Sequence, residues 1–321
     1  MGRWHAHAAR RVGSRIVAIV DPDRARASLL ASRTGQNPLI TDDVSQAIRE
    51  SRAEVVHICS PVESHEQLAR VAILAGAHVL VEKPVAHELE VVESLHRTAT
   101  EHGVMLCPVH QFLFQRGVLS AQRALPSLGL VRQLDVVTCS AGADHETSAG
   151  REAIALDILP HGLALSRRLL GRELTAAVWS VNGDVSGEMR LAAQLGSALV
   201  TIAVSMRARP TENSFVLRCD GGTVRGDLFH GFATIDRGQP SRWNKIGRPF
   251  VASSRVFGAA GLNLLGRATR NEPAYPGLRE LIGRFHGAAA GRGGPPIAVA
   301  ESLDVARLRD RVARERSQSV P

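Results

Sequence analysis

Short apolar runs alternate with amphipathic segments along the first third of the chain. The runs have the length and the β-branched content of buried parallel strands, and they cover residues 14–23, 53–60, 77–84 and 104–112. The amphipathic segments are predicted helices at residues 2–11, 24–35, 42–51, 63–76 and 88–103. Strands that alternate with helices of this length predict a parallel sheet with helices on both faces. The pattern therefore indicates an α/β domain of the doubly wound, Rossmann type.

The pattern changes after about residue 112. Several apolar runs then follow one another as predicted strands, at residues 173–183, 188–196, 197–208, 213–222 and 223–238. Turn sequences such as NGD and DGG separate some of these runs, as in β-hairpins. We therefore predict two domains. Residues 1–112 carry the parallel sheet, and residues 113–321 form an α+β domain with an open, largely antiparallel sheet.

The start of the chain fits part of a dinucleotide-binding fingerprint. In such sheets the first strand lies centrally and ends in G-x-G-x-x-G, and an acidic residue about 20 positions later contacts the ribose. Asp21 closes the first apolar run and is the expected ribose ligand. Gly2 fits the last glycine of the fingerprint, the one needed for close helix–strand packing. The first strand and the other two glycines are absent from the sequence, so we expect Met1 to be an internal methionine of this turn.

Composition limits the class of protein. The chain has 321 residues, of which 44% are hydrophobic and 22% charged, as is typical of globular proteins. No run approaches the roughly 20 apolar residues of a membrane-spanning helix, and the charged opening does not resemble a signal peptide. The four cysteines lie far apart in apolar surroundings, which predicts reduced thiols rather than disulfides or a zinc site. We expect a cytoplasmic protein without a metal.

The net charge of +8 is concentrated in one segment, residues 237–270. Seven basic residues and no acidic one lie between Asp236 and Glu272. Part of this segment, residues 251–270, is predicted as an amphipathic helix, which two glycines weaken. An ordinary packed helix is the first interpretation; contact with an anionic substrate and contact with a membrane or partner are the alternatives. Nucleic-acid binding is not favoured, because aromatic residues make up only 4% of the chain.

Longer motifs resemble the Gfo/Idh/MocA family of NAD(P)-dependent oxidoreductases. They are "GRWHAHAAR" at the start, "SPVESHEQLARVAILAGAHVLVEKP" at 60–84, "ALDILPHGLALSRRLLG" at 155–171 and the C-terminal stretch 275–312. The resemblance implies the two-domain fold, NAD or NADP as cofactor and an enzyme that acts on CH–OH groups. It also implies a small-molecule substrate, sugar-like or cyclitol-like, and a homodimer or homotetramer.

The resemblance assigns roles to residues of the central motif. Lys83 is expected to contact the reacting oxygen, where an amine can donate up to three hydrogen bonds and stabilise an alkoxide. Glu82 is expected near the nicotinamide ribose. A solvated loop is the plain alternative for this pair. The remaining expected cofactor contacts are Ser60, Pro61 and His65, and for His65 a role at a helix start is an equal alternative.

Asp157 and His161 are four residues apart, so they share one face if the segment is helical. A carboxylate that holds an imidazole in one tautomer makes a general base, which alcohol oxidation needs. Pro160 is tolerated best in a first helical turn, so we expect the helix to begin near Asp157. Asp157 is then a helix cap, a catalytic residue or both, and His161 is a catalytic base or a half-buried helix histidine.

Other positions leave the substrate and the cofactor open. His110 and Gln111 are expected to line the substrate cleft, although "HQFLFQRG" replaces the family's Arg-Phe-x-Pro element. Asp21 favours NAD over NADP, because a carboxylate repels a 2′-phosphate; nearby arginines keep NADP possible. His5 and His7 lie two apart on the opening helix and are interpreted as structural side chains. Two rival functions are a non-catalytic ligand-binding or regulatory relative and an adaptor that binds a membrane or partner through a basic surface.

Overall fold

The computed structural model describes residues 1–238 and 242–318, apart from the side chains of 242–246. The chain forms two compact units. Unit 1 consists of Met1–Val109 and Leu278–Ala306, and unit 2 consists of His110–Gly277 and Arg307–Pro321. The expected domains, residues 1–112 and 113–321, differ from these units by placing 110–112 in the first domain and 278–306 in the second. The reason is that helix α9 (Leu278–Ala289) packs against α1 (Gly2–Arg11), at the opposite end of the sequence.

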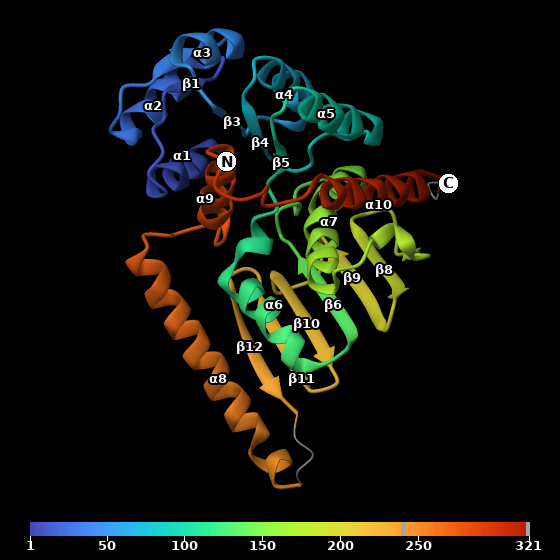
Figure 1. The fold of residues 1–321 in the computed structure, drawn as a ribbon. Coiled ribbons are helices and arrows are strands. Elements are labelled where there is room, and N and C mark those ends of the chain that lie inside the picture. The colour runs from blue at the N-terminus through green and yellow to red at the C-terminus, as the bar shows by residue number, and fades with distance from the viewer. Residues whose placement is uncertain (239–241, 319–321) are drawn as a thin grey trace. The chain divides into compact units, whose positions relative to one another are not determined.

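Unit 1 is built from short strands that alternate with helices (Figure 1). Its strands are β1 (Ala18–Val20), β2 (Leu39–Thr41), β3 (Val55–Ile58), β4 (His78–Val81) and β5 (Leu106–Pro108). Its helices are α1, α2 (Arg24–Thr34), α3 (Val44–Ser51), η1 (Val62–Ser64), α4 (His65–Leu74), α5 (Leu89–Glu101), α9 and the first part of α10 (Val299–Gln318). The predicted strands and helices of this region are confirmed. Strand β2 was not predicted, because the apolar run that contains it covers only residues 38–40.

The strands of unit 1 form two parallel groups. Strand β1 pairs with β2, and β4 lies between β3 and β5. No strand of residues 1–238 or 242–318 is hydrogen-bonded between β1 and β3. The two groups correspond to the parts of the 3-2-1-4-5-6 Rossmann order on either side of its first strand. The predicted Rossmann-type sheet is thus present, in two hydrogen-bonded groups.

Local signals explain where the helices of unit 1 begin and end. Helix α2 starts at Asp23, whose Oδ1 accepts hydrogen bonds from the backbone N–H groups of residues 25 and 26. Asp43 caps α3 in the same way. Helix α2 ends at Gly35, which has φ +63° and needs the left-handed conformation that glycine permits. Fully buried Ile73 and Leu95 pack under β4, where helices α4 and α5 meet the sheet.

Unit 2 contains a seven-stranded sheet in the order β12-β11-β10-β6-β9-β8-β7. The strands are β6 (Val131–Cys139), β7 (Ser180–Asn182), β8 (Glu188–Leu195), β9 (Ala198–Ser205), β10 (Glu212–Cys219), β11 (Gly222–Asp227) and β12 (Phe232–Arg237). Only the β6–β9 pair among these is parallel, so the prediction of a largely antiparallel sheet is confirmed. The predicted strand 223–238 is two strands, β11 and β12. Strand β6 was not predicted.

Helices cover this sheet and flank it (Figure 1). They are η2 (Gln111–Phe114), α6 (Arg116–Leu128), α7 (Ser148–Leu170), η3 (Leu174–Ala176), α8 (Arg242–Thr269) and the later part of α10. Helix α7 packs on β6 and β9, where an added Cβ at Gly162 would lie 3.0 Å from Cγ2 of Ile202. The absence of a side chain at Gly162 therefore lets α7 approach the sheet closely.

The expected start of α7 near Asp157 is wrong. The helix begins at Ser148, and Thr147 caps it by accepting a hydrogen bond from the N–H of Gly150 at 3.1 Å. Pro160 lies in the middle of the helix and is buried. An internal proline costs about 3 kcal/mol or more in helix stability. Burial of the surrounding helix face, including Leu159 and Leu163, offsets that cost and keeps the helix continuous.

Candidate functional site

Glu82 and Lys83 follow the last residue of β4. In open parallel sheets, ligands bind beyond the carboxyl ends of the strands. The backbone N–H of Glu82 donates to the carbonyl of Ile58 at 2.9 Å, which fixes this segment beside the end of β3. The Glu82 side chain is nearly buried, and its Oε1 lies 3.0 Å from Nε2 of His5. Helix α1 thus holds the carboxylate that precedes Lys83.

His65, the first residue of α4, ties two parts of the predicted site together. Its ring is 1% exposed. Nδ1 lies 2.9 Å from the carbonyl oxygen of Pro84, and Nε2 lies 3.0 Å from that of Ser60. Ser60 also accepts a hydrogen bond from the hydroxyl of Ser64 at 2.7 Å, and Pro61 begins the short helix η1. His65 therefore positions the 60–64 turn against the segment that carries Lys83.

Asp21 lies just beyond β1, at the carboxyl end of that strand. Its side chain is partly exposed, and its Oδ1 accepts a hydrogen bond from the N–H of Asp23 at 2.9 Å. Arg24 and Arg26 begin α2 and are exposed, and Arg26 pairs with Asp23 at 3.0 Å. A carboxylate held at a strand end in this way suits a ribose diol.

Gly2 is the first residue of α1. An added Cβ at this position would meet no described heavy atom within 4 Å. The close helix–strand packing expected of this glycine is therefore not seen among the residues that the structure describes. Gly2 instead stands in the first turn of a ten-residue helix, and the N-terminal end of a helix attracts anions.

In unit 2 the structure brings the predicted residues His110 and His161 together. Their ring centroids are 6.0 Å apart and nearly perpendicular, and the ring of Phe112 lies 4.6 Å from that of His161. His110 and Gln111 are buried, whereas His161 is partly exposed. Helix α7 supplies His161, His110 precedes η2, and Phe112 lies within η2.

Asp157 lies one turn before His161 on α7. Its carboxylate is 3.9 Å from the guanidinium of Arg309 on α10. Arg309 is nearly buried and the Asp157 side chain about one-third exposed. Because Asp157 lies well inside the helix, the prediction that it caps α7 is wrong; Thr147 does so.

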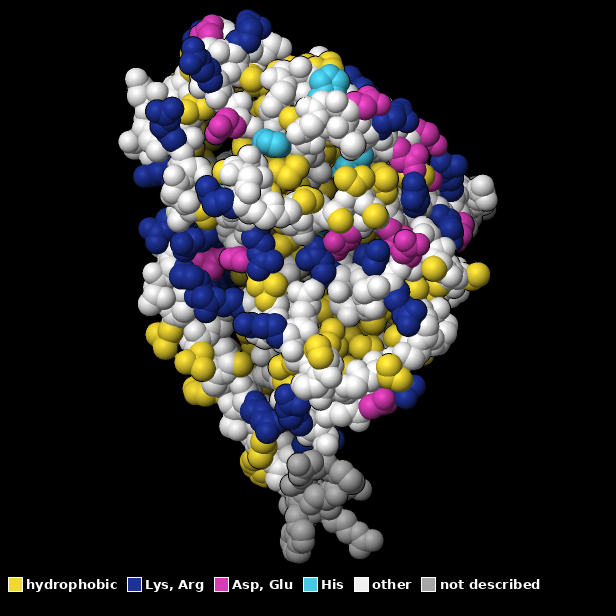
Figure 2. Space-filling view, in the orientation of Figure 1, with side chains coloured by type: hydrophobic (Ala, Val, Ile, Leu, Met, Phe, Trp, Pro, Cys, Tyr) yellow, Lys and Arg dark blue, Asp and Glu magenta, His cyan; other side chains and the backbone are white. Residues whose placement is uncertain are grey.

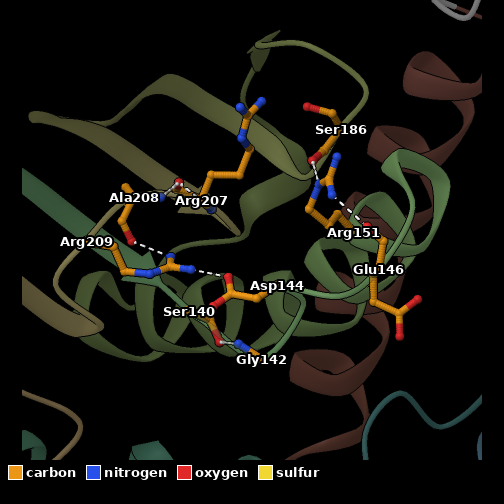
Figure 3. A network of polar contacts seen from close by, with 10 residues as sticks. Ser140, Gly142, Asp144, Glu146, Arg151, Ser186, Arg207, Ala208 and Arg209 are labelled. Atoms are coloured by element: carbon orange, nitrogen blue, oxygen red, sulfur yellow. Dashed lines mark hydrogen bonds and ion pairs between the residues drawn. The ribbon is translucent and has the colours of Figure 1, made fainter.

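A polar network that the sequence did not single out lies beyond the ends of the parallel strands β6 and β9 (Figure 3). Arg209 pairs with Asp144 of the loop that leads to α7. Arg151 donates to the carbonyl oxygens of Glu146 and Ser186, at 2.6 and 3.1 Å. The Arg207 side chain points away from Asp144 in Figure 3 and is exposed. The network holds the loop before α7. Its sequence signal was the pair of arginines, Arg207 and Arg209, around the end of the apolar run 197–208.

The thiols carry no sign of nucleophilic chemistry. All four cysteines are free, as predicted. Burial, reinforced by the charge of Glu82, raises the pKa of Cys59 to about 12, so this thiol stays protonated.

No cluster of three or more His, Cys, Asp or Glu side chains within residues 1–238 and 242–318 could hold a metal ion. None of the helices in these ranges is long and apolar enough to cross a membrane.

The basic segment 237–270 forms helix α8, although residues 239–241 and the side chains of 242–246 lie outside the described residues. Its arginines pair within unit 2. Arg255 pairs with Asp236, Arg270 with Glu272, and Arg267 donates to the carbonyls of Glu272 and Pro273. Figure 2 shows hydrophobic side chains along the edge that α8 forms. The exposed surface of the segment is thus apolar as well as basic.

Known proteins resemble this chain in sequence and in fold. The myo-inositol dehydrogenase Hyg17 of Streptomyces leeuwenhoekii is 27% identical over 183 residues, 56% of this chain and 55% of that protein. Inositol 2-dehydrogenase 4 of Saccharopolyspora erythraea is 28% identical over 258 residues, 74% of each chain. The chain spans about half the length, or less, of the first three curated relatives it matches.

Among solved structures, the WlbA dehydrogenase of Bordetella pertussis, in complex with NADH and UDP-GlcNAcA, superposes with a TM-score of 0.77. It is 17% identical, and the match covers 99% of this chain and 93% of that one. This likeness establishes the fold of both units. Residues 1–110 match the Gfo/Idh/MocA oxidoreductase family, NAD-binding Rossmann fold. The family match covers the first third of the chain, which is thus similar to the NAD-binding domain of these oxidoreductases.

Proposed function

We propose that this chain is an NAD(P)-dependent oxidoreductase that interconverts a secondary hydroxyl and a ketone on a sugar-like or cyclitol-like substrate. The observation that carries the proposal is the Glu82-Lys83 pair at the carboxyl end of β4, with the carboxylate held by His5. Its support from relatives is that several are inositol dehydrogenases and one is a 1,5-anhydro-D-fructose reductase.

The residues of unit 1 fit a dinucleotide. Gly2 lies in the first turn of α1, and the N-terminal end of a helix suits a pyrophosphate. Asp21 offers a carboxylate to a ribose diol, and Ser60, Pro61, His65 and Glu82 surround the segment that carries Lys83. A bound nicotinamide supplies the hydride acceptor or donor. The carboxylate of Asp21 favours NAD, because it would repel a 2′-phosphate.

Three side chains take roles at the reacting oxygen. Lys83 donates hydrogen bonds to that oxygen and stabilises the alkoxide character that develops as hydride leaves. His161 accepts or returns the hydroxyl proton, as a general base or acid. Asp157 orients the ring of His161 and is itself held near Arg309. His110 and Gln111 contact the substrate beside His161.

The proposed partners are a small molecule and a second copy of this chain. The exposed apolar face of α8 supports a homo-oligomer, because Phe250 and Phe257 are 78% and 84% exposed while Arg255 and Arg267 are engaged within unit 2. A face of this kind suits another apolar surface better than an anionic membrane. Free thiols support a cytoplasmic location.

Lys83→Ala tests the proposal. We expect the wild-type chain to bind NADH in calorimetry and to reduce NAD⁺ with a polyol from a panel that includes myo-inositol. The variant should keep NADH binding within threefold and lose at least about 100-fold in kcat, the usual scale of a lost proton-transfer or oxyanion contact. Arg70→Ala, which removes an exposed pair with Glu66 on α4, is the matched control and should leave both unchanged.

The outcomes separate the rival functions. Turnover without dependence on Lys83 would overturn the assigned role of this residue. NADH binding without turnover on any polyol or keto-sugar would favour the non-catalytic relative. If the wild-type chain neither binds NADH nor turns over a substrate, and binds anionic vesicles in a salt-sensitive way, the adaptor function is favoured.

A further inference from the structure

Three histidines of unit 1 join Glu82 to Ser14 through an unbroken row of hydrogen bonds. Nε2 of His5 lies 3.0 Å from Oε1 of Glu82, and Nδ1 of His5 lies 3.0 Å from Nδ1 of His57. Nε2 of His57 lies 2.8 Å from Nε2 of His286, and Nδ1 of His286 lies 2.5 Å from the Ser14 hydroxyl. The residues come from α1, β3, α9 and the segment that follows α1. We call this set the histidine row.

When Glu82 is ionised and all three rings are neutral, hydrogen-bond chemistry permits one arrangement of protons. A carboxylate only accepts, so His5 must donate from Nε2 and accept at Nδ1. His57 then donates from Nδ1 and accepts at Nε2, and His286 donates from Nε2 and accepts at Nδ1. The Ser14 hydroxyl donates to His286. Every bond has one proton, all of them point toward Glu82, and all three rings are neutral.

The surroundings favour neutral rings at His57 and His286. Burial lowers the pKa of His57 well below its ordinary value, and a charge on His5 or His286 would lower this pKa further. Burial also lowers the pKa of His286, as a charge on His5 would. A cationic ring fits the row only if every group between it and Ser14 reverses its donor and acceptor roles, because two N–H groups would otherwise face each other.

Adding one proton reverses the row without breaking it. With Glu82 protonated, its O–H donates to His5, His5 donates from Nδ1, His57 from Nε2 and His286 from Nδ1. The Ser14 oxygen now accepts. The reversal consumes one proton at the Ser14 end and places one on Glu82, and only N–H and O–H bonds are exchanged. Ser14 is partly exposed, so water can supply or remove that proton.

We propose that His5, His57 and His286 form a proton relay between solvent at Ser14 and the buried carboxylate beside Lys83. Its purpose rests on the proposed function: oxidation of a hydroxyl releases one proton, and the relay gives a proton that reaches Glu82 a path to solvent that does not pass through His161. In the reductive direction the relay carries a proton inward. The proton arrangement itself is independent of the substrate.

Ring tautomers test the relay directly. Long-range ¹H–¹⁵N spectra of the full chain with labelled histidine, at pH 7.5, report which ring nitrogen carries the proton. We expect His57 on Nδ1, with His5 and His286 on Nε2. A different pattern, or an imidazolium among the three at this pH, would overturn the relay.

The variant His57→Phe keeps an aromatic ring and removes both nitrogens. We expect His5 and His286 to lose their fixed tautomers, whereas His102→Phe, a change at an exposed histidine of unit 1, should leave the pattern intact. Unchanged tautomers in His57→Phe would contradict the relay. If this variant does not fold, His57→Gln serves in its place and should shift at least one neighbouring ring.

Kinetics with myo-inositol and NAD⁺ as probes then separate the two proposals. A working relay predicts about a tenfold fall in kcat for His57→Phe with KM unchanged, and equal kinetics for His102→Phe and wild type. Equal kcat in all three would overturn the catalytic purpose of the relay. If wild type turns over no polyol, the proposed function fails, and the tautomer pattern still decides whether the row is ordered as described.

Discussion

At the scale of single residues, burial decides how histidines titrate. His96 on α5 is 2% exposed, and its Nε2 lies 2.8 Å from the Ser302 hydroxyl. Burial lowers the pKa of His96 from 6.5 to about 4. Between these two pH values the unfolded chain binds a proton that the folded chain excludes. The free energy of unfolding therefore falls as pH falls from about 6.5 toward 4.

His96→Gln should flatten this dependence, because glutamine can bond Ser302 but does not titrate in this range. We expect wild type to lose about 2 kcal/mol more unfolding free energy than the variant between pH 7.5 and 5. Urea unfolding at the two pH values measures the difference. His102→Gln, at an exposed position, is the control and should follow wild type; equal slopes for His96→Gln and wild type would refute the assignment.

At the scale of elements, helix α7 is stabilised by contacts with residues distant in the sequence as well as by its own local sequence. Glu152 is nearly buried and pairs with Arg316 near the end of α10, and it also accepts a hydrogen bond from the N–H of Gly187 at 3.0 Å. Arg316 in turn donates to the carbonyls of Asp184 and Glu188. One arginine thus joins α7, α10 and the start of β8.

Arg316→Met should destabilise unit 2 strongly. Removing one partner of a buried ion pair leaves an uncompensated charge, which typically costs about 3–5 kcal/mol. Arg314→Met removes an exposed arginine that pairs with Asp310 on the same helix, and should cost about 1 kcal/mol or less. Chemical unfolding of both variants measures the contrast. Similar losses of unfolding free energy in the two variants would show that the buried pair stabilises the protein no more than the exposed pair does.

Helix α8 shows how an element can be predicted correctly while its surface is not. The sequence indicated an amphipathic helix with arginines opposite apolar residues. The structure engages Arg255 and Arg267 within unit 2, and it exposes Leu262, Leu264 and Leu265. The side of α8 that carries these arginines is therefore the side that packs on unit 2. Asp236 and nearby backbone carbonyls of unit 2 accept hydrogen bonds from the arginines.

At the scale of the whole molecule, the exposed face of α8 predicts self-association. Phe257→Ser should shift the chain from oligomer toward monomer at micromolar concentration, measured by sedimentation velocity. Val178→Ser is the matched control, because Val178 is 91% exposed but lies outside α8. A monomeric wild type, or an oligomer insensitive to Phe257→Ser, would contradict the predicted interface.

Most elements follow from local patterns. The helix starts at Asp23 and Asp43, and the stop at Gly35, depend on caps that the sequence displays. Strand β2 and the sequence after Gln115 escaped prediction for different reasons. The apolar run that contains β2 covers only residues 38–40. Between α6 and β6 the stop signal at Gly129 was not recognised. The start of α7 was misplaced because a local rule about Pro160 was overridden by burial.

The candidate site was predicted unevenly. Residues of one continuous motif, such as Ser60, His65 and Glu82, were identified together, and the structure ties them within unit 1. Residues distant in sequence were not connected. His57 is a polar residue within an apolar run, and His286 lies on a C-terminal helix, so neither position by itself indicated the other.

By itself, the sequence determined the alternation of strands and helices, the change to hairpins and the motif that carries Lys83, because each depends on residues close together in the chain. Tertiary structure alone decided the return of α9 to the first unit, the continuity of α7 through Pro160, the inward pairing of the α8 arginines and the histidine row. Each of these depends on burial or on contacts between residues far apart, and no local pattern records which distant groups will share a buried space.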